Sequence, residues 1–134
     1  MKKIIRELFF FGLVGTVGFL VDVGILYLLK PLIGLYFGRA FSFLSAVFIT
    51  WLFNRLYTFK DRETNKTLLF EFAHYLSYML AGGAINLGSY YLLIHQVRFI
   101  NEQPVYAVAF GSLAGMLVNF ISSRFFLYSK EKNQ

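Results

Sequence analysis

The chain has 134 residues, of which 57% are hydrophobic, 20% aromatic and only 15% charged. A soluble domain carries about 25% charged residues, and one this small could not bury so much apolar side chain. Cysteine is absent, which excludes disulfides, thiol catalysis and thiolate metal sites.

Long apolar runs fill most of the chain. Four of them can be delimited: Leu8–Leu29, Tyr36–Tyr57, Phe72–Ile94 and Pro104–Phe126. Each has about 22 residues, so a helix over each would be about 33 Å long, enough to cross a hydrocarbon core of about 30 Å. The runs predict an all-α integral membrane protein with four transmembrane helices in one domain, residues 1–134.

The first run resembles a signal peptide because it follows Met1-Lys2-Lys3. It is too long for the apolar part of such a peptide, and it ends at Lys30-Pro31 without a small-residue cleavage site. We therefore expect it to be retained as the first helix.

The 13 basic residues give a net charge of +6, and their placement favours a membrane topology over nucleic-acid binding. Ten lie at the N-terminus, around the central loop or at the C-terminal end: Lys2, Lys3, Arg6, Arg55, Lys60, Arg62, Lys66, Arg124, Lys130 and Lys132. Three lie on the opposite side: Lys30, Arg39 and Arg98. Because positive residues are retained in the cytoplasm, both termini and the central loop are predicted to be cytoplasmic.

The two halves of the chain overlay after a shift of about 68–69 residues. Gly15 and Gly18 then fall on Gly83 and Asn86, and Arg55 falls on Arg124. Each half is a hairpin of two helices, at about residues 4–61 and 72–130. Two helices per repeat predict a parallel repeat, related by an axis along the membrane normal.

Small and polar residues follow each other at a spacing of four in the second and fourth runs. The two stripes are Ser42, Ala46, Thr50 and Asn54, and Gly111, Gly115, Asn119 and Ser123. This spacing places each stripe on one face of a helix. One interpretation is close packing of helices through small residues; the other is a polar groove that leads to a cationic site for a lipid headgroup.

Asp22 lies well inside the first run, where an ionised carboxylate costs at least about 3 kcal/mol unless it is paired or hydrated. Its candidate partners are Arg39, near the start of the second helix, and Asn86, within the third. A structural ion pair with Arg39 and a proton-coupling carboxylate both remain open, and Asn86 has either a coupling or a structural polar role.

The arginines are candidates for binding phosphate, because the guanidinium fork matches phosphate oxygens better than an ammonium does. Arg39 is not required by topology, whereas Arg55 and Arg124 mark the cytoplasmic ends of the second and fourth helices and could also be snorkelling anchors. The candidate phosphate-binding set is Arg39, Arg55, Arg124, Asn54, Asn119 and Thr50.

Most of the aromatic residues are expected to form belts at the two membrane interfaces. The outer belt would contain Tyr27, Tyr36 and Phe37, and the inner belt Trp51, Tyr57, Phe59, Tyr75, Phe125, Phe126 and Tyr128. No catalytic triad, paired carboxylates or nucleotide-binding motif is recognisable, so we expect no enzyme activity, no cofactor and no metal.

The segment Phe11–Asp22 resembles the opening of GtrA-like membrane proteins, and Thr50–Lys60 resembles the stretch that closes their first hairpin. Asn119–Tyr128 is a second copy of that stretch. The resemblance spans nearly the whole chain, with departures at Thr50, Ser123 and Gly18, where asparagine is common in the family.

The resemblance implies a protein of the bacterial cytoplasmic membrane that serves cell-surface polysaccharide synthesis or glycosylation. It implies binding and flipping of a polyprenyl-phosphate carrier, either bare undecaprenyl phosphate or its sugar-linked form, together with membrane glycosyltransferases. Four helices enclose little interior, so a homodimer with a shared cleft is also expected. The alternatives are a small proton-coupled drug-type transporter that uses Asp22 and a non-transporting scaffold for a glycosyltransferase.

Overall fold

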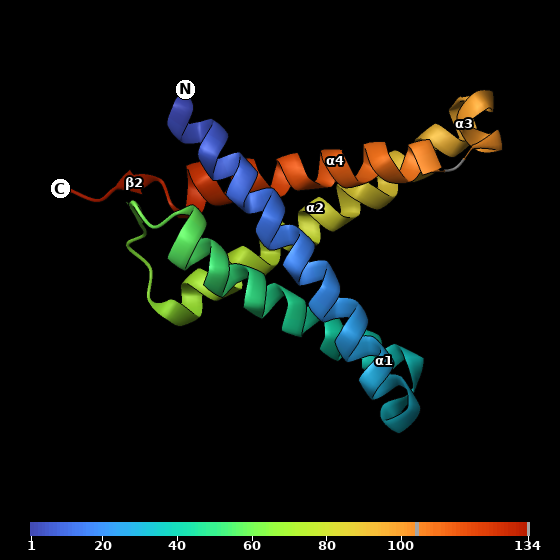
Figure 1. The fold of residues 1–134 in the computed structure, drawn as a ribbon, viewed down its shortest axis with the longest axis horizontal. Coiled ribbons are helices and arrows are strands. Elements are labelled where there is room, and N and C mark those ends of the chain that lie inside the picture. The colour runs from blue at the N-terminus through green and yellow to red at the C-terminus, as the bar shows by residue number, and fades with distance from the viewer. Residues whose placement is uncertain (104, 134) are drawn as a thin grey trace. The chain divides into compact units, whose positions relative to one another are not determined.

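The computed structural model describes residues 1–103 and 105–133, and these are almost entirely helical (Figure 1). Its elements in chain order are α1 (Lys2–Phe53), the π-helix η1 (Asn54–Thr58), β1 (Arg62–Glu63), α2 (Leu68–Gln96), α3 (Arg98–Glu102), α4 (Val105–Ser122), the π-helix η2 (Ser123–Leu127) and β2 (Lys130–Glu131). Apart from the two-residue strands, the predicted all-α fold is confirmed. Such a fold satisfies every backbone polar group inside its own segment, as a lipid environment requires.

The chain divides into two compact units, and each contains one pair of apolar helical segments. Hairpin 1 comprises Met1–Asn65 together with Lys130–Gln134, and hairpin 2 comprises Lys66–Ser129. The strand β2 therefore follows hairpin 2 in sequence but belongs to hairpin 1, where it pairs antiparallel with β1.

In hairpin 1, α1 contains two helical segments joined at Gly34. Gly34 has φ +83° and ψ 175°, a conformation that glycine adopts without the steric cost other residues incur. The first helix was expected to end at Lys30-Pro31, but Pro31 lies inside α1 and the break comes three residues later. The glycine, with its freedom at positive φ, makes the turn, and not the proline.

In hairpin 2, α2 and α4 lie side by side (Figure 1). The short helix α3, which the sequence analysis did not predict, connects them together with its flanking residues. Pro104, the first residue of the fourth apolar run, lies outside the described residues. The backbone N–H of Val97 at the end of α2 bonds to the carbonyl of Leu93 at 3.0 Å, so α2 ends in a closed turn.

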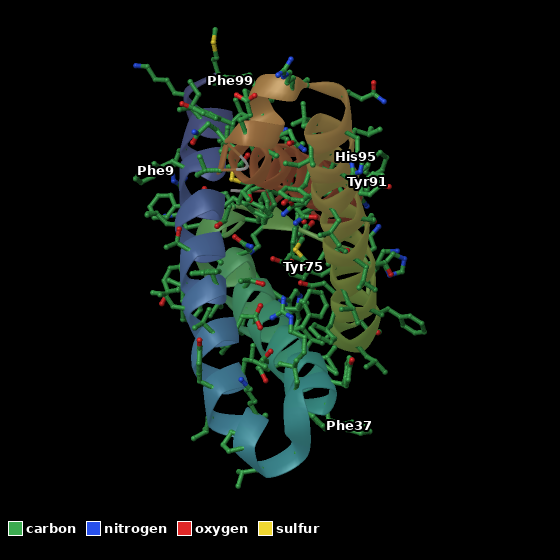
Figure 2. The ribbon with its side chains drawn as sticks, turned by 90° about the vertical axis from the view of Figure 1, so that its right-hand side faces the viewer. Phe9, Phe37, Tyr75, Tyr91, His95 and Phe99 are labelled. Carbon is green, nitrogen blue, oxygen red and sulfur yellow. The ribbon has the colours of Figure 1, made fainter. Side chains whose placement is uncertain are left out.

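The helices present large apolar side chains on their outer surfaces. Phe9 is 62% exposed and Phe37, beyond the bend of α1, is 69% exposed (Figure 2). Among the described residues, three segments are long and apolar enough to cross a membrane: Lys2–Thr58, Leu68–Gln96 and Val105–Leu127. A multi-pass membrane protein is the consequence; because α1 is broken at Gly34, the predicted count of four spans stays a prediction.

Part of the inner aromatic belt predicted from the sequence is wrong. Trp51 is 7% exposed, Phe59 and Tyr75 are 1% exposed, and Tyr128 is 2% exposed. These rings are buried within the protein, so they are not exposed at a membrane interface. By contrast, Tyr57 is exposed, as an interfacial side chain would be.

Candidate functional site

Asp22 and Arg39 form an ion pair between the two helical segments of α1, with Nη1 of Arg39 2.5 Å from Oδ1 of Asp22. Of the two candidate partners of Asp22, the structure shows Arg39; a structural or a coupling role for the pair stays a prediction. The Asp22 side chain is 16% exposed and the Arg39 side chain is 55% exposed. The pair neutralises a carboxylate that would otherwise be costly within an apolar segment. It also leaves the guanidinium accessible, with N–H donors that Asp22 does not use.

The stripe in the second half of α1 faces the first half of the same helix. Ser42 is fully buried, and its hydroxyl donates to the carbonyl of Arg39 at 3.0 Å. Thr50 donates to the carbonyl of Val47 at 3.0 Å, and its methyl group lies where a Cβ on Gly18 would have to be. A glycine at position 18 therefore lets the two segments approach closely, as small residues do between membrane helices.

Asn54 closes this stripe at the start of η1 and is 1% exposed. Its Oδ1 accepts a hydrogen bond of 2.7 Å from the hydroxyl of Thr58. The structure thus places Thr50 and Asn54, two of the predicted phosphate-binding residues, in the interior of hairpin 1. Their role in packing is visible, whereas their role toward a phosphate stays a prediction.

In hairpin 2 the stripe makes the same kind of contact between α4 and α2. Gly111 lies against Asn86, Gly115 lies against the carbonyl of Gly82, and Gly82 in turn lies against the side chain of Asn119. The packing interpretation of the stripe therefore holds in both hairpins. Asn86 takes part in this close contact, which accounts for a structural role.

The contacts correct the predicted alignment of the two halves. Gly18 faces Thr50 and Gly82 faces Asn119, so Gly82 is the counterpart of Gly18, and the predicted counterpart Asn86 is one turn too far along. The shift of 69 residues places Thr50 on Asn119 along the second helices, whereas the first helices are related by a shift of 64. Hairpin 2 therefore has five more residues between Gly82 and Asn119 than hairpin 1 has between Gly18 and Thr50, in the stretch that contains α3. No single shift of the sequence aligns both helices of the two halves, although the same glycine contact occurs in each.

Each hairpin ends its second helical segment in a five-residue π-helix at the same position. The backbone N–H of Phe59 bonds to the carbonyl of Asn54 at 2.8 Å, and that of Tyr128 bonds to Ser123 at 2.8 Å. π-Helices are rare and frequent at functional sites. Their recurrence at one offset supports the predicted duplication.

The predicted cations Arg55 and Arg124 both lie within these π-helices. Arg55 is exposed. The guanidinium carbon of Arg124 lies 4.6 Å from the centre of the Phe125 ring. Their position at the end of an apolar helical segment suits either an anchor or a headgroup contact. The two arginines lie in different hairpins.

Two buried acids escaped the sequence analysis. Glu7 is 2% exposed and accepts from Nε of Arg62 at 2.7 Å, while Glu71 is 1% exposed and accepts from the Tyr128 hydroxyl at 2.6 Å. Both acids stand near the start of the first helix of their hairpin, 64 residues apart. The sequence signal that could have revealed them is a glutamate among apolar residues at equivalent places in both halves.

A comparison with protein families matches residues 10–128 to the GtrA/DPMS transmembrane domain. The chain belongs to this family. A search of curated proteins finds no match. Family membership agrees with the helical hairpins and with the resemblance carried by Phe11–Asp22. It associates the chain with membrane processes that involve polyprenyl-phosphate sugars.

Proposed function

We propose that the protein binds a polyprenyl-phosphate lipid, bare undecaprenyl phosphate or its sugar-linked form, and moves its headgroup across the membrane. Membership of the GtrA/DPMS transmembrane family supports the class of lipid. The observation that carries the mechanism is Arg39, a 55% exposed cation inside a segment apolar enough to span a membrane. A phosphate cannot cross hydrocarbon unaided, because each buried charge is costly.

The proposed mechanism separates the lipid into two parts. The apolar tail stays in the bilayer against the exposed side chains of the helices, and only the phosphate needs a polar path. Arg39 would donate to the phosphate with the N–H groups that Asp22 leaves unused. Asp22 holds the guanidinium in place, and it compensates the positive charge when the site is empty.

The remaining assignments belong to the same proposal. The protein would lie in the bacterial cytoplasmic membrane, with four spans and both termini inside, as the distribution of lysine and arginine favours. Arg55, Arg124 and Asn119 would contact the headgroup near the cytoplasmic side, in a homodimer that works with membrane glycosyltransferases in surface polysaccharide synthesis. The role is transport, and no catalysis is assigned to the chain.

The decisive experiment measures lipid movement in phosphatidylcholine vesicles that contain the purified full chain and undecaprenyl phosphate. A phosphatase added outside hydrolyses lipid of the outer leaflet, so movement is the rate at which inner-leaflet lipid becomes hydrolysable. Arg39→Gln should slow this rate by about ten- to a hundredfold, since a hydrogen bond to a charged group contributes about 1.5–3 kcal/mol. The rate for Arg39→Lys should lie between those of the wild type and Arg39→Gln, because lysine keeps the positive charge but lacks the two-pronged donor geometry of the guanidinium.

Controls separate transport from folding. Arg98→Gln removes a 95% exposed cation whose recorded partner is Glu102, and it should leave the rate unchanged. Asp22→Asn combined with Arg39→Gln leaves no unpaired charge and should fold yet remain slow. An Arg39→Gln protein that moves lipid as fast as wild type would refute the proposal.

The same preparation tests the alternatives. Release of protons on addition of a lipophilic cation, abolished by Asp22→Asn, would identify a drug-type transporter. A protein that moves no lipid but copurifies with a glycosyltransferase would be a scaffold.

A further inference from the structure

The chain passes between the two hairpins at two places, and hairpin 1 brings these places together. The boundaries of the units lie between Asn65 and Lys66 and between Ser129 and Lys130. In hairpin 1, the ammonium group of Lys130 donates to Oδ1 of Asn65 at 3.3 Å. In sequence, hairpin 2 is therefore an insertion in the unit of hairpin 1, and both of its connections start from neighbouring residues.

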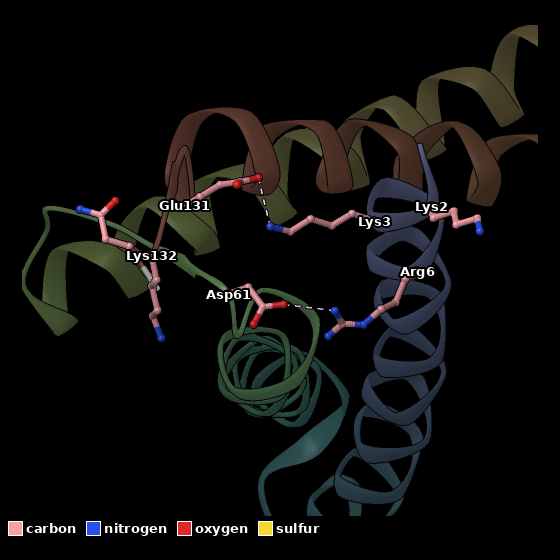
Figure 3. A pocket seen from close by; sticks show the side chains of 7 residues that line it. Lys2, Lys3, Arg6, Asp61, Glu131 and Lys132 are labelled. Atoms are coloured by element: carbon pink, nitrogen blue, oxygen red, sulfur yellow. Dashed lines mark hydrogen bonds and ion pairs between the residues drawn. The ribbon is translucent and has the colours of Figure 1, made fainter.

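The strands β1 and β2 hold the two places of passage side by side. They pair antiparallel, and the backbone N–H of Lys132 donates to the carbonyl of Asp61 at 3.0 Å. In Figure 3 a dashed line joins Glu131 of β2 to Lys3 at the start of α1, with Oε1 3.0 Å from Nζ. The same oxygen lies 3.6 Å from Nη2 of Arg62 in β1. The paired strands and the two ion pairs of Glu131 together form a clasp within hairpin 1.

In hairpin 2, a single residue, Glu71, bonds to both connections. Its backbone N–H donates to the carbonyl of Thr67 at 2.8 Å, and its side chain accepts from the hydroxyl of Tyr128 at 2.6 Å. Glu71 is 1% exposed and Tyr128 is 2% exposed, so this attachment is buried. Between the contacts at its two ends, each connection has one residue, Lys66 in the first and Ser129 in the second, and both are exposed.

Two short connections that lie side by side restrict the motion of the bodies they join. One link would allow turning about any axis through it, whereas two attachment points allow free turning only about the line between them. Protein hinges are a few loop or element-terminal residues that absorb changes in φ and ψ, and Lys66 and Ser129 both lie outside the helices and strands. The clasp is the weaker attachment, because Glu131 is 62% exposed and exposed ion pairs contribute little.

We propose that hairpin 2 pivots on hairpin 1 about Lys66 and Ser129, and that the clasp limits this pivoting. Transporters built from two repeats change access by rocking one repeat against the other. A pivot between the repeats is a device that such transport could use. The proposal concerns the mechanics of the chain itself, so it goes beyond the proposed function and does not depend on which lipid the protein binds.

The test measures distances between pairs of nitroxide labels by pulsed electron paramagnetic resonance, on the full chain in nanodiscs of phosphatidylcholine. The chain has no cysteine, so two introduced cysteines carry the labels without further changes. Leu20→Cys in hairpin 1 with Leu92→Cys in hairpin 2 reports on the pivot, and both positions are more than half exposed. Leu69→Cys with Leu92→Cys is the reference pair, because both positions lie in α2, about 34 Å apart along a rigid helix.

The test variant inserts about six glycine and serine residues between Ser129 and Lys130, which lengthens one connection and leaves the clasp residues unchanged. Such a flexible insert has a mean span on the order of 13 Å, so the distance distribution between the hairpins should broaden about twofold or more. The matched control has the same insert after Asn133, beyond the clasp, and should give the wild-type distribution. Glu131→Gln, which removes both ion pairs of the clasp, should broaden the distribution less, and Glu102→Gln should not broaden it.

The outcomes decide the proposal. An insert after Ser129 that leaves the distribution unchanged, or an insert after Asn133 that broadens it equally, would show that no pivot exists at these residues. The reference pair should stay narrow in every variant. If the insert broadens the reference pair as well, it disturbs hairpin 2, and Glu131→Gln alone decides, with broadening in favour of the pivot and no broadening against it. Arg39→Gln should leave these distances unchanged while it slows lipid movement, so failure of the pivot and failure of the transport proposal give different results.

Discussion

Hairpin 1 and hairpin 2 share one architecture but stabilise their interiors differently. Hairpin 1 buries a carboxylate against an arginine, Glu7 with Arg62, whereas hairpin 2 buries Glu71 against the neutral hydroxyl of Tyr128. In hairpin 1 the hydroxyl of Thr58 satisfies Oδ1 of Asn54; in hairpin 2 neither Oδ1 of Asn119 nor Oγ of Ser123 has a hydrogen-bond partner among the described residues. Both hairpins thus pack through a glycine and bury an acid, but they differ in the groups that bond to the acid and to the polar residues at the end of the stripe.

This difference separates what the shared architecture requires from what each copy does with it. Both hairpins need a small residue where the helices cross, a π-helix at the end and a buried acid near the start. Only the partners of these groups differ. The residue that bonds to a buried polar group can differ between the hairpins, provided that the buried group keeps a hydrogen bond or costs little without one.

The largest expected effect distinguishes the two buried acids. Glu7→Ala should destabilise the protein by about 3–5 kcal/mol, because it removes the buried carboxylate from the Arg62 guanidinium and leaves it the longer, exposed contact with Glu131 at 3.6 Å. Tyr128→Phe in hairpin 2 should cost only about 1–3 kcal/mol, since it removes a neutral donor. Unfolding in mixed micelles by increasing detergent denaturant measures both; equal losses would show that the pairs are equivalent.

The glycine contacts come next. Gly82→Ala should cost about 1–3 kcal/mol through overpacking, because the new methyl group would overlap the amide of Asn119. Adding Asn119→Ala should recover most of that loss. Gly83→Ala is the matched control: nothing lies within 4 Å of its Cβ position, so the better helix propensity of alanine should make it neutral or stabilising.

In hairpin 1, Gly18→Ala should behave as Gly82→Ala does, with rescue by Thr50→Ala, whose smaller side chain clears the space. Measured unfolding free energies for the two glycine series would compare the crossings directly. A tolerated Gly18→Ala next to a damaging Gly82→Ala would mean that only hairpin 2 depends on close contact.

The ends of the two stripes give a smaller contrast. Asn54→Ala should destabilise by about 1–2 kcal/mol, because the Thr58 hydroxyl loses its acceptor in a buried place. Ser123→Ala, at the equivalent place, removes a buried hydroxyl that has no recorded partner and should be neutral or slightly stabilising. If Ser123→Ala instead costs as much as Asn54→Ala, a bound water or ligand satisfies that hydroxyl.

The smallest effect concerns the surface ion pair of Arg6 and Asp61. The hydrogen bond from Arg6, more than any other influence, lowers the pKa of Asp61 below its usual value of 3.8. Since the folded-state pKa is the lower one, the pair stabilises the fold above pH 4, and this contribution disappears as pH falls through the folded-state value. Asp61→Asn should flatten that part of the acid stability curve only slightly, because the group is solvent-exposed; a large change would place Asp61 in a wider network.

Several features could be predicted from the residues alone because the bilayer leaves few choices. Apolar runs long enough to span it must be helical, and an aspartate among them must find a cation, so the helices and the Asp22–Arg39 pair followed. The stripe of Ser42, Ala46, Thr50 and Asn54 likewise indicated the buried face, since its spacing matches a helix.

Other features were hidden from sequence reasoning. The first helix was expected to end at Lys30-Pro31, whereas the break lies at Gly34, and the aromatic rings at Trp51 and Tyr75 were assigned to the interface but are buried. The rings were misassigned because a side chain's type does not tell which face of its helix meets the partner helix. The correspondence of Gly18 with Gly82, 64 residues apart, was missed because the alignment used one shift of about 68–69 residues, which fits only the second helices.

The sequence by itself determined that this is a helical membrane protein of two similar halves, since hydrophobicity, charge placement and spacing are properties of the chain read locally. The tertiary structure alone decided which polar groups meet. Glu7 reaches Arg62 across 55 positions, and the segment after hairpin 2 returns to hairpin 1, where β2 pairs with β1. Contacts between distant residues depend on how helices pack and where a two-residue strand pairs, and neither leaves a periodic signal in the chain.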